Sequence, residues 1–116
     1  MAVVLFTRVP ELTVDRYDRM MIELGLDANP PAGLILHVTS EAVGSVNVCE
    51  VWQTAQAAES FVEGRLRNAL RNQGVKEPLS YRIEPLRNLF APDFDTIGRI
   101  GSTSLPGSVA RTARAS

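Results

Sequence analysis

Cysteine, lysine and histidine are nearly absent from this sequence: it holds one of each, Cys49, Lys76 and His37. A single cysteine cannot form an internal disulfide, so the chain is not a small disulfide-stabilised secreted scaffold. No group of histidine, cysteine and carboxylate residues has metal-ligand spacing, and we expect no metal site. The formal net charge is only -1, which gives no general attraction to nucleic acid.

Long apolar runs are also missing. No stretch approaches the ~20 apolar residues that cross a bilayer, and residues 1–8 have neither a basic leader nor an apolar run long enough for a secretion signal. We therefore expect a cytoplasmic protein that does not bind membranes. A phosphate-binding glycine loop and a nucleophile elbow are absent as well. What remains is 45% apolar and 22% charged, the balance of a folded domain with one core.

The apolar patterns predict strand, helix, strand, strand, helix and strand in that order. The predicted elements are residues 2–9, 14–24, 34–38, 46–53, 55–73 and 79–86. Thr13 and Thr54 are placed to cap the two helices, and Gly25 and Gly74 to end them. Because each crossover carries a helix, this order favours an α+β, ferredoxin-like βαββαβ split sandwich. In that fold, a four-stranded antiparallel sheet carries both helices on one face.

The central strands are apolar on both faces. On the second strand, Leu34, Leu36 and Val38 are expected on one side and Ile35 on the other. The helices can cover only one face, and a large exposed apolar patch is unusual in a soluble monomer. We therefore expect a homodimer in which two copies pack sheet against sheet.

Three segments carry a resemblance to a known family: Gly33–His37, Val48–Thr54 and Ala58–Phe61. The most specific feature is a strand that ends in Trp-Gln-Thr and leads directly into an alanine-rich helix. Over residues 2 to about 90, the chain resembles the dimeric α/β-barrel superfamily, and within it the antibiotic-biosynthesis-monooxygenase-like branch. The resemblance implies a dimeric α/β barrel whose subunits each hold a ligand cavity between sheet and helices.

The resemblance also suggests classes of function. Haem-degrading members bind the iron through a histidine on the second helix, which has none here, so we expect no haem and no other cofactor. The remaining enzymatic classes are cofactor-independent oxygenases, isomerases and cyclases that act on an apolar small molecule. The alternatives are a ligand-binding or accessory protein without chemistry, and an interaction module recruited through its C-terminal end.

His37 and Glu50 are the candidate catalytic residues, because each interrupts an apolar strand. Histidine changes charge near neutral pH and serves as a general base. A carboxylate is costly to bury without a partner. Two simpler interpretations stay open: His37 is a core or interface histidine, and Glu50 pairs with Arg82 or Arg8 from another strand.

Whether His37 and Glu50 meet depends on the register of the hairpin. A two-residue loop at Val43–Gly44 places Glu50 opposite His37, whereas a three-residue loop places Cys49 there and Glu50 opposite Leu36. Valine is unfavourable at the positive φ of a two-residue turn, so the longer loop is favoured. In that register, the two candidates lie on opposite faces of the sheet.

Four further side chains are candidates for substrate binding: Tyr17, Trp52, Thr39 and Asn47. Tyr17 lies on the inner stripe of the first helix, where its hydroxyl could enter a cavity, and Trp52 suits a pocket wall. Core packing alone is the more common reason for aromatic residues at such positions, and it stays open for both. Cys49 is expected to be an inert buried thiol, because nothing nearby in sequence lowers its pKa.

The chain divides into a predicted domain, residues 1–90, and a C-terminal extension, residues 91–116. From Gly98 onward, glycine, serine, threonine, alanine and arginine dominate, a composition typical of a flexible end. Residues 100–105 faintly resemble the cargo-loading tails that dock into encapsulin shells. That resemblance implies a protein partner for the tail as the alternative to flexibility.

Overall fold

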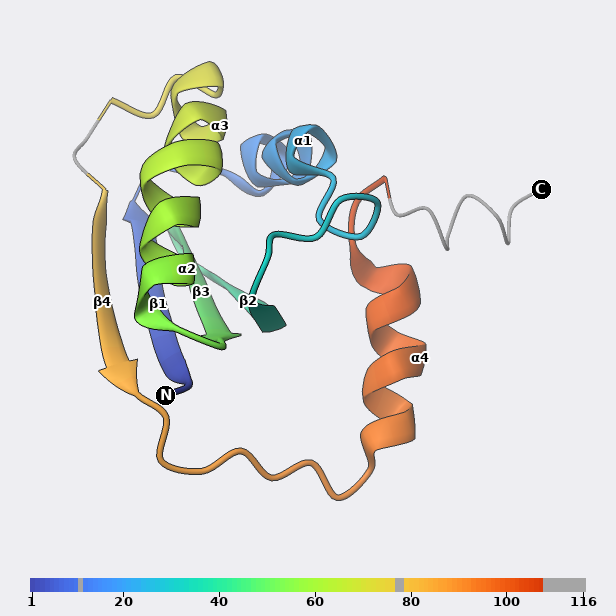
Figure 1. Ribbon diagram of the computed structural model, residues 1–116. Helices are drawn as coiled ribbons and strands as arrows, with labels where there is room; N and C mark the ends of the chain where they lie inside the picture. Colours follow the sequence, from blue (N-terminus) through green and yellow to red (C-terminus); the bar gives the residue numbers. More distant parts are fainter. Residues whose placement is uncertain (11, 77–78, 108–116) are drawn as a thin grey trace.

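The computed structural model describes residues 1–10, 12–76 and 79–107 (Figure 1). Its sheet has the strand order β2-β3-β1-β4, and every neighbouring pair is antiparallel. The predicted ferredoxin-like α+β architecture is confirmed. The elements are β1 (Val3–Pro10), α1 (Val14–Leu24), β2 (Leu34–Ala42), β3 (Ser45–Trp52), α2 (Ala55–Phe61), the π-helical turn η1 (Val62–Leu66), α3 (Arg67–Asn72), β4 (Ser80–Pro85) and α4 (Phe94–Ser104).

The two covering helices begin and end where the capping residues predict. Thr13 Oγ1 accepts a hydrogen bond from the Arg16 backbone N–H at the start of α1, and Gly25 ends α1 with a φ of 55°. Thr54 caps α2 in the same way. The predicted second helix is continuous through α2, η1 and α3, with one π turn in its middle. None of the helices in the described part is long and apolar enough to cross a membrane.

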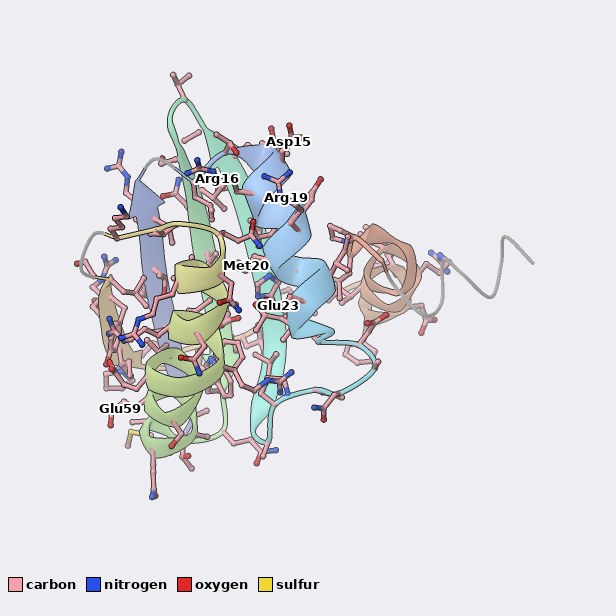
Figure 2. The ribbon with its side chains drawn as sticks, turned by 90° about the horizontal axis from the view of Figure 1, so that it is seen from above. Asp15, Arg16, Arg19, Met20, Glu23 and Glu59 are labelled. Atoms are coloured by element: carbon pink, nitrogen blue, oxygen red, sulfur yellow. The ribbon has the colours of Figure 1, made fainter. Side chains whose placement is uncertain are left out.

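The core lies between the sheet and these helices, which cover one face side by side (Figure 2). Its largest fully buried side chains are Trp52, Leu5, Val46 and Val62. Polar contacts on the outer surface also join the helices: Arg19 of α1 donates to Gln73, and Asn72 donates to Glu23. α1 is therefore held over β2 and β3 by contacts at both its inner and outer surfaces.

A β-bulge at the start of β2 corrects one expectation. Leu34 pairs with Trp52, but Leu36 pairs with Val51, and the register shifts between them. Since directly paired residues share a face, Leu34 lies on the helix-covered face and Leu36 on the open face. The prediction that Leu34 and Leu36 point the same way is therefore wrong.

The hairpin register is the second correction. Ala42 pairs with Ser45, so the loop is the two residues Val43–Gly44, and Glu50 lies opposite His37. The three-residue loop was predicted because valine is unfavourable in a two-residue turn, and this prediction is wrong for two reasons. The positive φ of the loop, 74°, falls on Gly44, where glycine has no steric penalty. The observed register also gives the buried Glu50 side chain its hydrogen bond with His37, which a one-residue slip would remove.

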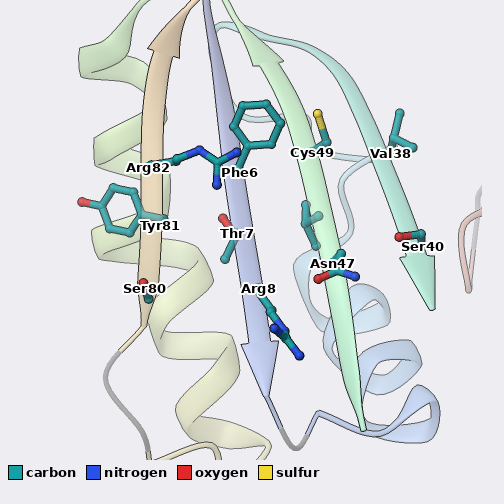
Figure 3. A pocket seen from close by; sticks show the side chains of 11 residues that line it. Phe6, Thr7, Arg8, Val38, Ser40, Asn47, Cys49, Ser80, Tyr81 and Arg82 are labelled. Carbon is teal, nitrogen blue, oxygen red and sulfur yellow. The ribbon is translucent and has the colours of Figure 1, made fainter. Parts of the chain in front are cut away.

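The open face of the sheet, which the helices do not cover, is only partly apolar. By register, its apolar side chains are Val4, Phe6, Leu36, Val38, Cys49 and Val51. Its polar side chains are Arg8, Ser40, Ser45, Asn47, Ser80, Arg82 and Glu84. A shallow depression of about 440 Å³ lies among them (Figure 3). The Arg82 guanidinium sits 4.3 Å from the centre of the Phe6 ring, and it also donates to Glu84.

The C-terminal segment differs from its composition-based prediction. Helix α4 continues through Gly98 to Ser104, where a flexible end was expected, and residues 108–116 of the predicted tail lie outside the described residues. The chain leaves β4 at one edge of the sheet and runs across to α4, which stands beside β2 at the other edge (Figure 1). Leu105 then packs against the core.

Candidate functional site

Five of the six candidate site residues meet on the helix-covered face. Tyr17 comes from α1, His37 and Thr39 from β2, and Glu50 and Trp52 from β3. Each strand contributes residues two apart, because alternate side chains of a strand share a face. The pairing of His37 with Glu50 then brings the two strands' polar side chains together beneath α1.

The Glu50 carboxylate is the centre of this group. Its side chain is 3% exposed, and both oxygens have partners. Oε2 accepts from His37 Nδ1 at 2.6 Å, and Oε1 accepts from Trp52 Nε1 at 3.1 Å. A buried carboxylate with two donors is satisfied without an arginine. The arginine alternative for Glu50 is therefore not what the structure shows, since Arg82 pairs with Glu84 instead.

The contact with Glu50 fixes which nitrogen of His37 faces outward. With Nδ1–H donating to the carboxylate, neutral His37 presents Nε2 as an acceptor. Nε2 lies 2.9 Å from Thr39 Oγ1 and 3.3 Å from the Tyr17 hydroxyl. Tyr17 and Thr39 are 2.7 Å apart. All four side chains are satisfied when the Tyr17 hydroxyl donates a hydrogen bond to Thr39 Oγ1, the Thr39 hydroxyl donates to His37 Nε2, and His37 Nδ1–H donates to Glu50.

The surroundings of Tyr17 favour the protonated form of its phenol, which can donate a hydrogen bond. Burial raises the pKa of the Tyr17 phenol, and the negative charges of Asp18 and Glu50 add to that effect, while the hydrogen bond with Thr39 opposes it. On the opposite face of β3, burial raises the pKa of the Cys49 thiol, with a further contribution from Glu50. A raised pKa lowers the thiolate fraction at neutral pH, in agreement with an unreactive thiol.

A pocket of about 260 Å³ opens beside this hydrogen-bond chain. Helix α1 forms one wall, the strands form the floor, and the residues that follow α4 form the outer wall. The pocket is lined by Val14, Tyr17, Asp18, His37, Thr39, Glu41, Val46, Leu105 and Pro106. The His37 side chain is 14% exposed, and its Nε2 contacts the hydroxyls of Tyr17 and Thr39, which also line the pocket.

The interior directly under the helices is nearly full. A cavity of about 20 Å³ remains there, lined mostly by leucine, methionine and valine side chains and by His37 and Glu50. It has room for about one water molecule, and Thr7, whose buried hydroxyl has no hydrogen-bond partner among the described residues, also lines it. The space between sheet and helices is thus too small for an organic ligand, and the larger pocket lies at the edge, where α1 crosses β2.

Two candidate substrate-binding residues do not reach this pocket. Asn47 pairs with Ser40 on the open face, where it lines the depression with Arg8, so it cannot share a ligand with His37. Trp52 is fully buried and does not line the pocket. Its indole N–H instead positions the carboxylate of Glu50.

Sequence reasoning missed Asp18, Glu41 and the wall formed by Leu105 and Pro106. Glu41 could have been found, because it is two residues from Thr39 on a strand and so shares its face. The C-terminal wall left no local signal, since it depends on a contact between distant parts of the chain. Within the described ranges, no three histidine, cysteine or carboxylate side chains could hold a metal ion.

No protein-family model and no curated protein sequence matches this chain. Solved structures do match. They include NE2512 from Nitrosomonas europaea, a protein of unknown function (TM-score 0.61, 13% identity, 78% of this chain and 94% of that one). SnoaB from Streptomyces nogalater, a cofactor-independent oxygenase, aligns with a TM-score of 0.58 at 10% identity, over 79% of this chain and 98% of its own.

A third match is a provisionally assigned antibiotic biosynthesis monooxygenase from Chloroflexus aurantiacus (TM-score 0.57, 11% identity, 78% of this chain and 98% of that one). The chain has the ferredoxin-like fold of the antibiotic-biosynthesis-monooxygenase-like proteins. Identities this low establish the fold and assign no residue of the site. The function must therefore be argued from the geometry around His37.

Proposed function

We propose that this protein is a general acid–base enzyme that resembles cofactor-independent monooxygenases and acts on a small, mainly apolar molecule. The observation that carries the proposal is the directed hydrogen-bond chain from Trp52 and Glu50 through His37 to a pocket. A carboxylate that orients a histidine and stabilises its protonated form is a recurrent arrangement for proton abstraction.

In the proposed reaction, the substrate brings an acidic C–H or O–H bond to His37 Nε2. The proton passes to Nε2, and the bonding electron pair stays on the substrate as an anion. Glu50 stabilises the imidazolium through Nδ1–H, and the hydroxyls of Tyr17 and Thr39, once the substrate displaces them from Nε2, can donate to the substrate oxygen. General base catalysis of this type contributes about 10²–10⁴ to a rate.

Monooxygenation then follows without an external reductant. For a CH₂ group next to a carbonyl, two C–H bonds break, one atom of O₂ becomes the new carbonyl oxygen and the other leaves as water. The substrate supplies the four electrons. In an isomerase, the proton on Nε2 would instead return to a different carbon of the same molecule.

A specific observation favours the second candidate, a ligand-binding protein without chemistry. Nε2 already has hydrogen-bond partners in Thr39 and Tyr17, so a ligand must compete with them. A third candidate is recruitment through the C-terminal segment, which is supported by the exposed side chains of Phe90 and Phe94.

The deciding experiment uses 2-indanone, a small flat ketone with acidic CH₂ groups. NMR in D₂O measures exchange of its CH₂ protons, and an oxygen electrode measures O₂ uptake. We expect His37→Gln to slow exchange by about 10²-fold or more, with Asn47→Ala on the open face as the matched control that leaves it unchanged. Exchange with O₂ uptake supports an oxygenase, and exchange alone supports an isomerase. Binding of 2-indanone with neither would establish the non-catalytic candidate.

We further propose that the protein is a homodimer joined through the open face. Val38 is 50% exposed there, next to the apolar side chains of Leu36, Cys49 and Val51. A second copy of the same surface would cover this half of the face, and the helix-covered pocket of each subunit would stay accessible.

A further inference from the structure

The hydroxyl of Thr7 is buried under the helices but takes no part in the hydrogen-bond chain around His37. Thr7 of β1 is 4% exposed, and its Oγ1 has no hydrogen-bond partner in the part of the chain that the structure describes. Burying a hydroxyl without a hydrogen bond is unfavourable, so native structures pair nearly all such groups with protein or with ordered water. The position of Thr7 therefore raises the question of what its hydroxyl binds.

The interior cavity of about 20 Å³ lies beside Thr7. Most of its lining is apolar, and the polar residues that line it are Thr7, His37 and Glu50. One water molecule requires about 10–15 Å³ of such volume. A cavity bounded by apolar groups alone stays dry, whereas one that offers two or more polar partners holds water. The occupant is therefore decided by whether two of these polar groups can reach the same molecule.

The strand register puts Thr7 and Glu50 within reach of a single bridging molecule. Glu50 pairs directly with Leu5, and Thr7 pairs with Val48, so Thr7 and Glu50 are diagonal neighbours on the helix-covered face. Diagonal neighbours of an antiparallel pair lie about 7–8 Å apart, and their side chains are closer. Two successive O–H···O hydrogen bonds of about 2.8 Å each can cover such a separation.

The Glu50 carboxylate can accept a further hydrogen bond. An ionised carboxylate has about four acceptor sites, and the N–H groups of His37 and Trp52 occupy two of them. His37 has no ring nitrogen left for the same molecule, because Nδ1 contacts Glu50 and Nε2 contacts Thr39. Thr7 and Glu50 are therefore the polar side chains that the lining of the cavity offers to an occupant.

We propose that Thr7 and Glu50 bind one buried water molecule in this cavity. The water accepts a hydrogen bond from the Thr7 hydroxyl and donates one to the Glu50 carboxylate. It is the third donor on that carboxylate, and it extends the hydrogen-bond chain from α1 and β2 across β3 to β1. The site lies on the other side of β3 from His37, so the inference goes beyond the proposed enzyme and does not depend on proton transfer at Nε2.

The whole chain can be tested by ¹⁷O magnetic relaxation dispersion, which counts the water oxygens that a protein holds for longer than nanoseconds. Thr7→Val keeps the β-branched shape of the side chain but removes its hydroxyl, and it should lose one long-lived water relative to the wild type. Thr7→Ser keeps a hydroxyl at this position and should retain the water. A high-resolution crystal structure of the wild type gives the answer without a variant: we expect a water within hydrogen-bond distance of both Thr7 Oγ1 and the Glu50 carboxylate.

A second measurement tests the contact with Glu50. The ¹³C resonance of the Glu50 carboxyl carbon responds to the hydrogen bonds that the carboxylate accepts, so Thr7→Val should shift it. The matched control is Ser45→Ala, because the Ser45 hydroxyl is also buried without a partner among the described residues. Ser45 lies on the open face and does not line the cavity. That variant should leave the Glu50 resonance unchanged.

Several outcomes would overturn the inference: an unchanged water count in Thr7→Val, an equal loss in Thr7→Val and Thr7→Ser, a crystal structure with no water between Thr7 and Glu50, or a Glu50 resonance that shifts equally in Thr7→Val and Ser45→Ala. None of these measurements requires turnover. Loss of the water in Thr7→Val together with no effect of His37→Gln on proton exchange would refute the proposed enzyme and leave the water site standing. Proton exchange that depends on His37, with a water count that Thr7→Val does not change, would do the reverse.

Discussion

The two faces of the sheet are formed by the same strands, but their polar side chains have different surroundings. On β3, Glu50 and Trp52 point toward the helices, whereas Asn47 and Cys49 point the other way. On the helix-covered face, the carboxylate of Glu50 finds both its partners within the molecule, and the hydrogen-bond chain ends beside a pocket. The open face carries arginines and a depression that faces solvent. The difference shows that one residue of strand register decides whether a polar side chain joins a buried network or a surface.

The largest effect is expected from removing the centre of the buried network. Glu50→Ala leaves the His37 and Trp52 N–H groups without acceptors, and breaking a buried pair costs about 3–5 kcal/mol of unfolding free energy. Urea denaturation followed by Trp52 fluorescence measures this loss. The matched control is Glu84→Ala, whose carboxylate pairs with Arg82 in solvent and should cost less than about 1 kcal/mol. Similar losses for the two variants would contradict the contrast between the faces.

A smaller loss is expected where the register is set. Gly44 adopts a φ of 74°, and a Cβ there would meet no atom within 4 Å. Gly44→Ala should therefore cost only the backbone strain, about 1–2 kcal/mol. Chemical denaturation measures it, with Val43→Ala as the neighbouring control. An unchanged stability would mean that the loop does not need a left-handed residue and that the register has another origin.

The smallest effect on folding is expected on the open face, where assembly should change instead. Val38→Asp should shift the proposed dimer to a monomer in analytical ultracentrifugation, because a carboxylate buried in the interface would lack a partner. The unfolding free energy of the subunit should change by only about 0.5 kcal/mol. Val43→Asp, at the exposed hairpin tip, should leave the mass unchanged. A wild-type protein that sediments as a monomer at micromolar concentration would refute the dimer.

The fold was predictable because its signals are local. Threonine caps, glycine stops and apolar periodicity fix the order of elements, and few topologies accept that order. The identities of His37 and Glu50 as candidates followed from polar residues in apolar strands. Alternation along β3 alone also puts Asn47 and Glu50 on opposite faces of the sheet. The sequence was therefore enough to separate Asn47 from the other substrate-binding candidates.

The pairing and the pocket were not predictable for a physical reason. The free energy lost by placing Val43 in a two-residue turn is small compared with the cost of burying Glu50 without hydrogen-bond donors. That cost arises only when β2, β3 and the core are assembled. The outer wall of the pocket depends on Leu105, which arrives from the far end of the described chain. Contacts of this range have no signature in local sequence.

The path from β4 to α4 has one more consequence. Residues 87–93 can span at most about 25 Å when extended, and four strands place the edges of the sheet about 14 Å apart. Helix α4 lies beyond β2 and is about 10 Å wide, so the linker must be nearly extended, whereas lengthening it would cost little entropy. Insertions and substitutions here can reshape the outer wall while the Glu50–His37 pair stays untouched. The outer wall of the pocket and the Glu50–His37 pair can thus change independently, because they belong to separate parts of the chain.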